Sequence, residues 1–325
     1  MYVAALIYVD DVIMVGNNDA KIHDVKRHLN NRFSIKDLGP LKYFLGIEVA
    51  RTNEGLVLSQ QKYMFDILKD SGQHGCRPNP SPMEQNLHLD EAIDSPPVDV
   101  AQYRRLIGRL LYLQVTCPDI AFAVNMLSQF LANPCKRHMD SAIRVLRYLK
   151  STPGQGILLP KDGDLSLKDF CDADWSGCSF TRCSRTCYLI FLGEALVPWR
   201  TKKQSVVSRS SAEAEYRTMA TTVSEILWLC WLLHDHEAAP VGPTPLYCDN
   251  NAARQIANNP VFHECTKHVE MDCYFIRERV ESNEIEPLYI DTKHQVADIC
   301  IKALGAERFR FLLGKIGVRD LHAPS

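Results

Sequence analysis

The chain has 325 residues, of which 46% are hydrophobic and 23% are charged, a composition that favours a folded globular protein over a disordered one. Its net charge of -2 gives no overall attraction for nucleic acid, so any such binding must come from local clusters of Lys and Arg. Residues 226–233, the longest apolar run, are too few to cross a bilayer. No secretory signal opens the chain, and its 12 cysteines are scattered, so we expect reduced thiols, an intracellular location and no membrane partner.

The first fifteen residues form two apolar runs that meet at Tyr8-Val9-Asp10-Asp11, a pattern that predicts a hairpin with an acidic turn. A solvated turn is the plain interpretation. The motif also resembles the metal-binding hairpin of reverse transcriptases of the copia-type retrotransposon Pol family, and residues 33–39 and 45–49 resemble the segments that follow it there. Such polymerases have a third carboxylate on an earlier strand, and this chain begins nine residues before Asp10. We therefore expect Asp10 and Asp11 to be a vestigial metal pair without RNA-directed DNA polymerase activity.

Residues 1–72 are predicted to be a truncated reverse transcriptase palm and thumb remnant. The patterns there favour helices at 19–32 and 60–70 and a hairpin at 41–59. Residues 73–160 are predicted to be a proline-rich connector followed by helices at 103–115, 118–131 and 137–150, because apolar residues recur there every three or four positions. In the family this region joins the polymerase to the nuclease.

Two acids stand out in the next part of the chain. Residues 165–171 alternate as a half-buried strand does, and Asp172 follows, with Asp174 two residues later in an unassigned role. Turn-forming carboxylates are the alternative for both. Ser210 and Glu213 have the spacing of a capping box, whereas Glu215 lies on the apolar face of the same helix, where a carboxylate is costly unless it is protonated, paired or bound to metal. Stabilisation by the helix dipole is the alternative for Glu215.

Two further acids follow. Asp249 ends a short strand at 246–248 and opens a helix at 251–257, where an N-cap role is the alternative. Residues 266–281 are predicted to form a helix and residues 285–290 a strand. Asp298 falls in the first turn of a helix that ends near residue 304, where a dipole-stabilising role is again the alternative.

Taken together, the element order and the four acids resemble the ribonuclease H fold, and five motifs match its copia-type branch. These are Cys-Asp-Ala-Asp-Trp, Ser-Ser-Ala-Glu-Ala-Glu-Tyr, Tyr-Cys-Asp-Asn, Thr-Lys-His-Val-Glu-Met-Asp and Val-Ala-Asp-Ile. The resemblance implies an α/β (α+β) fold with a mixed five-stranded sheet in residues 161–310, followed by a tail at 311–325. It also implies that Asp172, Glu215, Asp249 and Asp298 hold two Mg²⁺ ions, with Mn²⁺ as an alternative, and hydrolyse the RNA of RNA/DNA hybrids without a small-molecule cofactor.

A cluster of basic residues precedes and follows these acids. Its members are Arg200, Lys202, Lys203, Arg209, Lys267 and His268. The sequence is equally consistent with binding of the hybrid's phosphates by these residues and with ordinary solvated surface charge. The chain also departs from the family pattern, with Cys187 where Gly is usual, Arg185 for a small hydroxyl residue, and Cys300-Ile301 for Phe-Thr. Cys187 is expected to strain the strand beside Asp172. The competing hypothesis is therefore a non-catalytic retroelement remnant that at most binds nucleic acid. The oligomeric state is not determined by the sequence.

Overall fold

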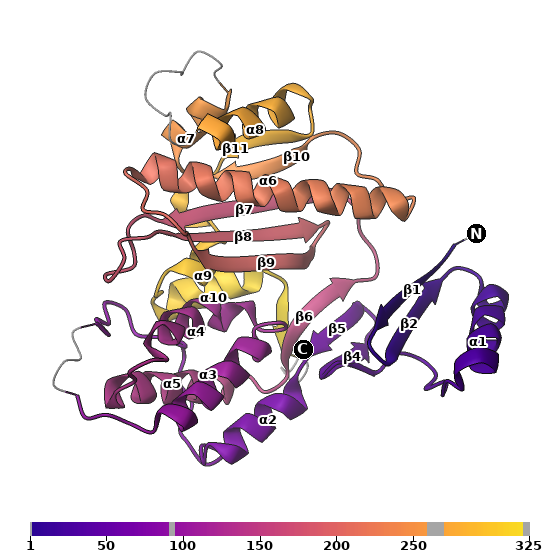
Figure 1. Cartoon of the computed structure of the whole chain (residues 1–325), viewed down its shortest axis with the longest axis horizontal. Coiled ribbons are helices and arrows are strands. Elements are labelled where there is room, and N and C mark those ends of the chain that lie inside the picture. The colour runs from indigo at the N-terminus through magenta and orange to yellow at the C-terminus, as the bar shows by residue number, and fades with distance from the viewer. Residues whose placement is uncertain (1, 91–94, 259–269, 321–325) are drawn as a thin grey trace.

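The computed structural model describes residues 2–90, 95–258 and 270–320 (Figure 1). Its strands form one two-stranded and two five-stranded sheets. Across these described ranges, no helix is both long enough and apolar enough to cross a membrane.

A mixed five-stranded sheet positions the four acids, and its strand order is β11-β10-β7-β8-β9. β7 pairs antiparallel with β8 and parallel with β10, while β8–β9 is antiparallel and β10–β11 is parallel. The mixed sheet predicted for residues 161–310 is confirmed. Its strands are β7 (Leu167–Asp174), β8 (Arg185–Leu192), β9 (Ala195–Lys203), β10 (Thr244–Cys248) and β11 (Ile285–Tyr289).

Helices cover both faces of this sheet. On one face lies α6 (Ser211–Asp235), flanked by α7 (Asn251–Asn258) and α8 (Glu270–Glu281), as Figure 1 shows. The apolar stripe predicted for α6 is confirmed, since Met219, Val223 and Ile226 are buried in one core with Leu246 of β10. α9 (Asp298–Ile301) packs on the opposite face, against β7 and β8. Glu215 is therefore on the helix of one face and Asp298 on the helix of the other.

The predicted connection helices pack beneath the same sheet rather than acting as a loose spacer. α3 (Val100–Leu113) and α5 (Lys136–Leu149) lie close to their predicted positions. The single helix predicted at 118–131 is wrong in detail, because the structure divides it into the 3₁₀ turn η1 (Pro118–Ile120), α4 (Ala121–Leu127) and the 3₁₀ turn η2 (Ser128–Phe130). Their side chains share one apolar core with the outer face of β8.

A second five-stranded sheet, entirely antiparallel, has the order β12-β6-β5-β4-β3. The hairpin predicted at 41–59 is confirmed, whereas β6 and β12 were not predicted. The sheet contains strands from three of the four predicted segments, 1–72, 73–160 and 311–325. The boundaries of these segments stay a prediction. Its strands are β3 (Tyr43–Phe44), β4 (Ile47–Arg51), β5 (Gly55–Ser59), β6 (Gln155–Pro160) and β12 (Val318–Asp320), with α2 (Gln61–Asp70) and α10 (Ala306–Lys315) beside them.

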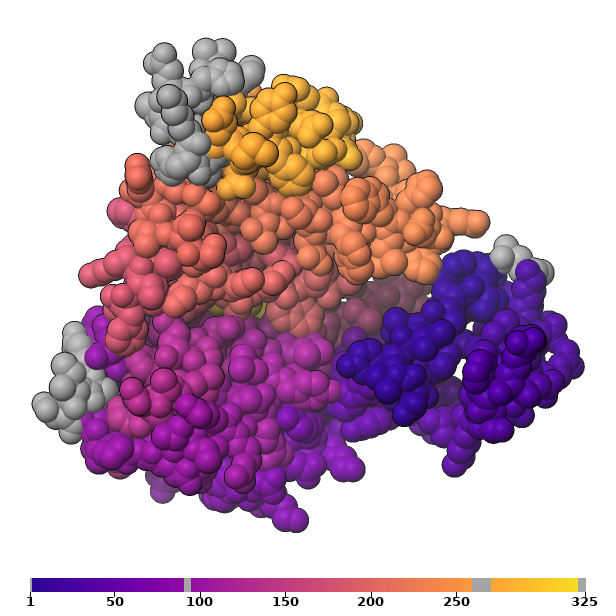
Figure 2. Space-filling view, viewed as in Figure 1, coloured from indigo at the N-terminus to yellow at the C-terminus, as the bar shows by residue number. Residues whose placement is uncertain are grey.

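The predicted acidic hairpin is confirmed, with Asp10 and Asp11 at the turn between β1 (Val3–Tyr8) and β2 (Asp11–Gly16). α1 (Asp19–Phe33) follows and has no buried residue. Figure 2 shows these indigo residues gathered at one side of the molecule. Ile7 is 67% exposed and Val9 81%, so the hairpin presents an apolar surface to solvent.

Candidate functional site

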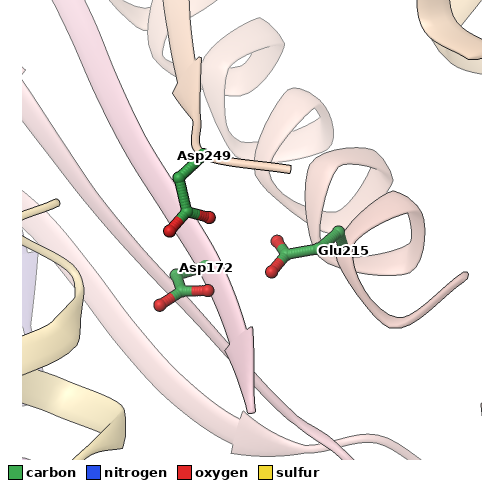
Figure 3. Close-up of side chains that lie close together, drawn as sticks. All are labelled: Asp172, Glu215 and Asp249. Carbon is green, nitrogen blue, oxygen red and sulfur yellow. The ribbon is translucent and has the colours of Figure 1, made fainter. Parts of the chain in front are cut away.

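Three of the four predicted acids converge at one end of the mixed sheet. Asp172 is on β7, Asp249 directly follows the neighbouring strand β10, and Glu215 is on α6 above them. One ligand atom from each lies within 4.8 Å of the other two, and Figure 3 shows the three carboxylates pointing toward one another. The parallel pairing of β7 with β10 explains the convergence of the two aspartates, because it brings the carboxyl ends of both strands to the same edge.

Neighbouring groups fix the orientation of each acid. The backbone N–H of Ala173 donates to Asp172 Oδ1 at 2.7 Å and to Glu215 Oε1 at 3.2 Å. The hydroxyl of Thr292, in the 3₁₀ turn η4 (Thr292–His294), donates to Asp249 Oδ2 at 2.8 Å. One backbone N–H therefore links Asp172 to Glu215, whereas the hydrogen bond to Asp249 comes from the exposed turn η4.

The environment of Asp172 and Glu215 disfavours their charged forms. Asp172 is 2% exposed and Glu215 is 5% exposed. Burial raises the pKa of Asp172 to about 7, although the Lys302 ammonium opposes the rise. Burial, and then the nearby Cys248 thiol and Asp172 carboxyl, raise the pKa of Glu215 well above its usual range. Clustered carboxylate oxygens of this kind suit a hard divalent cation such as Mg²⁺, so the residues present fit the metal that the fold implies.

Asp298 meets this cluster at Asp172, and its side chain is one of the groups that raise the pKa of Asp172. It lies in α9 and is not a member of the compact three-acid group. Lys302, four residues later, places its Nζ 2.9 Å from Asp172 Oδ2 and also contacts Asp298 Oδ1. Arg308 Nη2 lies 3.2 Å from the other oxygen of Asp298. Two cations therefore neutralise Asp298, and one of them connects it to Asp172.

Asp174 does not join the acid cluster and instead pairs with Arg185. Its Oδ1 accepts the backbone N–H of Arg185, and its Oδ2 lies 3.8 Å from Arg185 Nη1. The guanidinium of Arg185 is buried and stacks 5.6 Å over the ring of Phe122. Burial raises the pKa of Asp174 to about 6, against the pull of Arg185. Asp174 thus fixes the loop end of the β7–β8 hairpin.

Glu213 is used at the start of α6, as its spacing predicts. Ser210 accepts a hydrogen bond from the Glu213 N–H at 3.1 Å, and Glu213 Oε2 accepts one from the Arg209 N–H at 2.8 Å. Its other oxygen pairs with Arg217 at 3.0 Å. Glu213 and Glu215 therefore have different environments although only one residue separates them.

Three of the predicted basic residues line a groove of about 620 Å³ between β9, α6 and α8: Arg200, Lys202 and Lys203. Ala173, Thr186 and Lys202 are partners across β7, β8 and β9, so Lys202 lies two strands from Ala173, roughly 10 Å away. Arg209 precedes α6 and is not part of the groove lining. Lys267 and His268 fall outside the described residues.

Comparisons with known proteins agree with this architecture. Residues 2–85 match the family described as reverse transcriptase (RNA-dependent DNA polymerase). The chain is 41% identical to the retrovirus-related Pol polyprotein from transposon RE1 of Arabidopsis thaliana, over 96% of this chain and 21% of that protein. It is 34% identical to the putative transposon Ty5-1 protein of Saccharomyces cerevisiae, over 70% of this chain and 74% of that protein. The chain belongs to the copia-type retrotransposon Pol family.

This copia-type chain spans about a fifth of the length of the RE1 polyprotein. It corresponds to the C-terminal part of the reverse transcriptase followed by the ribonuclease H-like domain. Among solved structures, LC11-RNase H1 in complex with RNA/DNA hybrid is similar with a TM-score of 0.31 and 8% identity, over 40% of this chain and 88% of that one.

Two departures from the copia-type pattern contact each other. Cys187 of β8 and Cys300 of α9 are fully buried in the same core, and burial together with the Cys300 thiol raises the pKa of Cys187 well above its usual range. The expected strain at Cys187 is not visible in the ladder, because β7 and β8 pair without interruption from Asp174↔Arg185 to Leu167↔Leu192.

Several residues of this copia-type site were not predicted. Lys302 contacts two of the four acids, and Arg308 and Thr292 contact one each. The four-residue spacing of Asp298 and Lys302 on a helix could have indicated their pairing. No local pattern could have placed Lys302 beside Asp172, because 130 residues separate the two.

Proposed function

We propose that this chain is a Mg²⁺-dependent endonuclease that hydrolyses the RNA strand of RNA/DNA hybrids. The observation that carries the proposal is the convergence of Asp172, Glu215 and Asp249 within 4.8 Å beside a groove lined by basic side chains. Family membership supports the same activity, and the structure LC11-RNase H1 in complex with RNA/DNA hybrid names that substrate for a protein of similar architecture.

The chain's own residues supply the positioning that such a reaction needs. Asp172, Glu215 and Asp249 would hold the ions, and Asp298 would extend the set through its link to Asp172. Bound divalent ions activate the attacking water and stabilise the leaving 3′-oxygen. The Ala173 N–H fixes two of the acids and the Thr292 hydroxyl fixes the third, so little reorganisation is required when substrate arrives.

The basic groove is the proposed path of one strand of the hybrid. Lys202 and Lys203 project from the edge strand at the same end of the sheet as Asp172, where a strand backbone crossing the site would pass. Replacing either lysine by alanine should weaken hybrid binding at low salt and reduce the dependence of log Kd on log salt by about 1. Discrimination of RNA from DNA would rest on contacts to 2′-hydroxyls.

Cleavage of a labelled RNA/DNA hybrid in Mg²⁺ tests the proposal directly. Asp172→Asn should lower the rate at least about 100-fold, because a ligand is lost. Asp162→Asn is the matched control, since Asp162 is exposed and lies in the loop before β7. Equal rates in wild type and Asp172→Asn, or no cleavage by a folded wild-type sample, would contradict the proposal.

A second candidate is hybrid binding without cleavage, which is favoured by one observation. Asp298 is not in the compact acid group and is instead neutralised by Lys302 and Arg308. In this case the hybrid would bind with the salt dependence described above, and no Mg²⁺-dependent product would form from any strand. Binding and cleavage assays on the same sample separate the two candidates.

A further inference from the structure

The space beside Asp172 contains two places for a cation, and the chain fills one of them itself. On one side, Asp172, Glu215 and Asp249 form the compact acid group, and in the part of the chain that the structure describes no Lys or Arg forms an ion pair with Glu215 or Asp249. On the other side, the Lys302 ammonium lies between Asp172 and Asp298, 2.9 Å from Asp172 Oδ2 and in contact with Asp298 Oδ1. The two positions share Asp172 but differ in charge.

The side chain of Lys302 is suited to a removable contact. It is 40% exposed, whereas the side chains of Asp172 and Asp298 are 3% and 5% exposed. Only the tip of the lysine therefore enters the buried region. A lysine ammonium is a point charge on a flexible four-carbon stem, so it can leave by rotation of its own side chain without movement of α9.

Arg308 is not equivalent to Lys302. Its guanidinium is fixed by the backbone carbonyls of Thr292, at 2.7 Å, and of Lys293, and among the four acids it pairs with Asp298 alone. It supports Asp298 from the outer side and forms no ion pair with Asp172. A metal ion that binds between Asp172 and Asp298 would therefore compete with Lys302 and not with Arg308.

We propose that Lys302 is a positioning residue that occupies the Asp172–Asp298 position when one divalent ion is bound and must be displaced before a second can bind there. The inference rests on the proposed function for the identity of the ions. It makes the two binding events unequal, because the second ion has to displace the Lys302 ammonium, whereas the first meets that charge only as a neighbour on their shared ligand, Asp172. It also gives Lys302 a second role, which is to hold two buried carboxylates together in the metal-free chain.

Mn²⁺ binding to the full chain, measured by titration calorimetry at pH 8 without nucleic acid, tests this order of events. Wild type should bind one ion and take up a second with a Kd at least about tenfold higher. In Lys302→Met the Kd of the second ion should fall by about tenfold or more. Lys168→Met is the matched control, because Lys168 is also on the sheet but pairs with Glu194 on the surface, and its titration should equal that of wild type. An unchanged or weaker second Kd in Lys302→Met would overturn the proposal.

A measurement on wild type alone covers the case in which Lys302→Met does not fold. Acylation of lysine amines, mapped by mass spectrometry, should modify Lys302 several-fold faster in saturating Mn²⁺ than in EDTA, while Lys168 reacts at one rate in both. Equal reactivity of Lys302 in the two conditions would overturn the proposal. Neither readout requires cleavage, so a chain that binds ions in this order but does not cut hybrid contradicts only the proposed function.

Discussion

The carboxylates of Asp172 and Glu215 accept hydrogen bonds from one donor, the backbone N–H of Ala173, at 2.7 and 3.2 Å. A single N–H cannot neutralise two acids, and both are buried. The metal-free site is therefore unfavourable for the fold, because two carboxyl groups lie together with less positive charge than their ionised forms require. Stability and metal binding make opposite demands on Glu215.

Glu215→Gln should consequently stabilise the metal-free chain while abolishing its response to metal. In EDTA the variant should have a higher Tm than wild type, because a neutral amide replaces a buried acid of nearly the same shape. Addition of Mn²⁺ should raise the Tm of wild type and leave that of the variant nearly unchanged. Differential scanning calorimetry measures both effects on one sample. A variant that is less stable than wild type in EDTA and still gains stability from Mn²⁺ would contradict the assignment of Glu215.

The convergence of Asp172, Glu215 and Asp249 could be predicted because each acid follows from a local pattern and the motifs carry the topology. Glu215 shares an apolar helical face with Met219, and Asp249 ends a strand. These patterns record which way a side chain points within its own element. They contain no information on basic side chains from distant parts of the sequence, which is why the contact of Lys302 with Asp172 was not predicted.

The second sheet shows the same limit on a larger scale. β6 pairs with β5 and β12 although about 100 and 160 residues of sequence separate them. β6 (Gln155–Pro160) directly follows Thr152-Pro153-Gly154. In the sequence, these three residues indicate only that the preceding helix has ended. A short run of apolar residues is too short for its period to distinguish a strand from a connector, so the two partners of β6 could be found only from the fold.

Asp169 should be a destabilising residue of the nuclease sheet. It lies in the middle of β7 and is fully buried, and among the described residues no side chain donates a hydrogen bond to its carboxylate, which only the Phe170 backbone N–H helps to stabilise. Burial raises its pKa well above the usual range. Asp169→Ala should raise the free energy of unfolding by about 1–2 kcal/mol, measured by urea denaturation at pH 7. Asp162→Ala, on the surface, should change it by less than about 0.5 kcal/mol. A loss of stability in Asp169→Ala would show that the carboxyl has a partner role.

The pairing of β5 with β6 should contribute directly to stability. A Cβ on Gly156 would lie 2.5 Å from the Leu58 carbonyl oxygen and 2.9 Å from Val57 Cγ1. Gly156→Ala should therefore lower the free energy of unfolding by about 1–3 kcal/mol. Gly108→Ala is the control, because a Cβ there meets nothing within 4 Å and α3 should gain up to about 1 kcal/mol. If Gly156→Ala and Gly108→Ala changed the free energy of unfolding equally, the pairing of β5 with β6 would not contribute to stability as predicted.

Asp119 should make the stability of the connection region depend on pH. Burial raises its pKa, while hydrogen bonds from Tyr148 and from Gln155, the latter at 2.8 Å, oppose the rise. Because the folded-state pKa exceeds the unfolded value of 3.8, folding favours the protonated acid. The linked stability is complete below pH 3.8 and is lost as pH rises through the folded-state pKa. Asn cannot titrate, so the Tm of Asp119→Asn minus that of wild type should be more positive at pH 8 than at pH 5. An equal difference at both pH values would contradict this.

Asp10 and Asp11 should be chemically idle in this chain, although their hairpin forms as predicted. Both are exposed, and in residues 2–90, 95–258 and 270–320 no third His, Cys, Asp or Glu joins them in a group compact enough to hold an ion. Adjacent carboxylates repel, and two-metal chemistry needs ligands that bridge both ions. The double change Asp10→Asn with Asp11→Asn should leave hybrid cleavage unchanged, and the wild-type chain should not extend a primer on a template. Both are measured with labelled oligonucleotides in Mg²⁺. Primer extension by wild type that the double change abolishes would show that the hairpin finds its third ligand, since a second copy of the chain could bring one against the exposed strand formed by Val3–Tyr8.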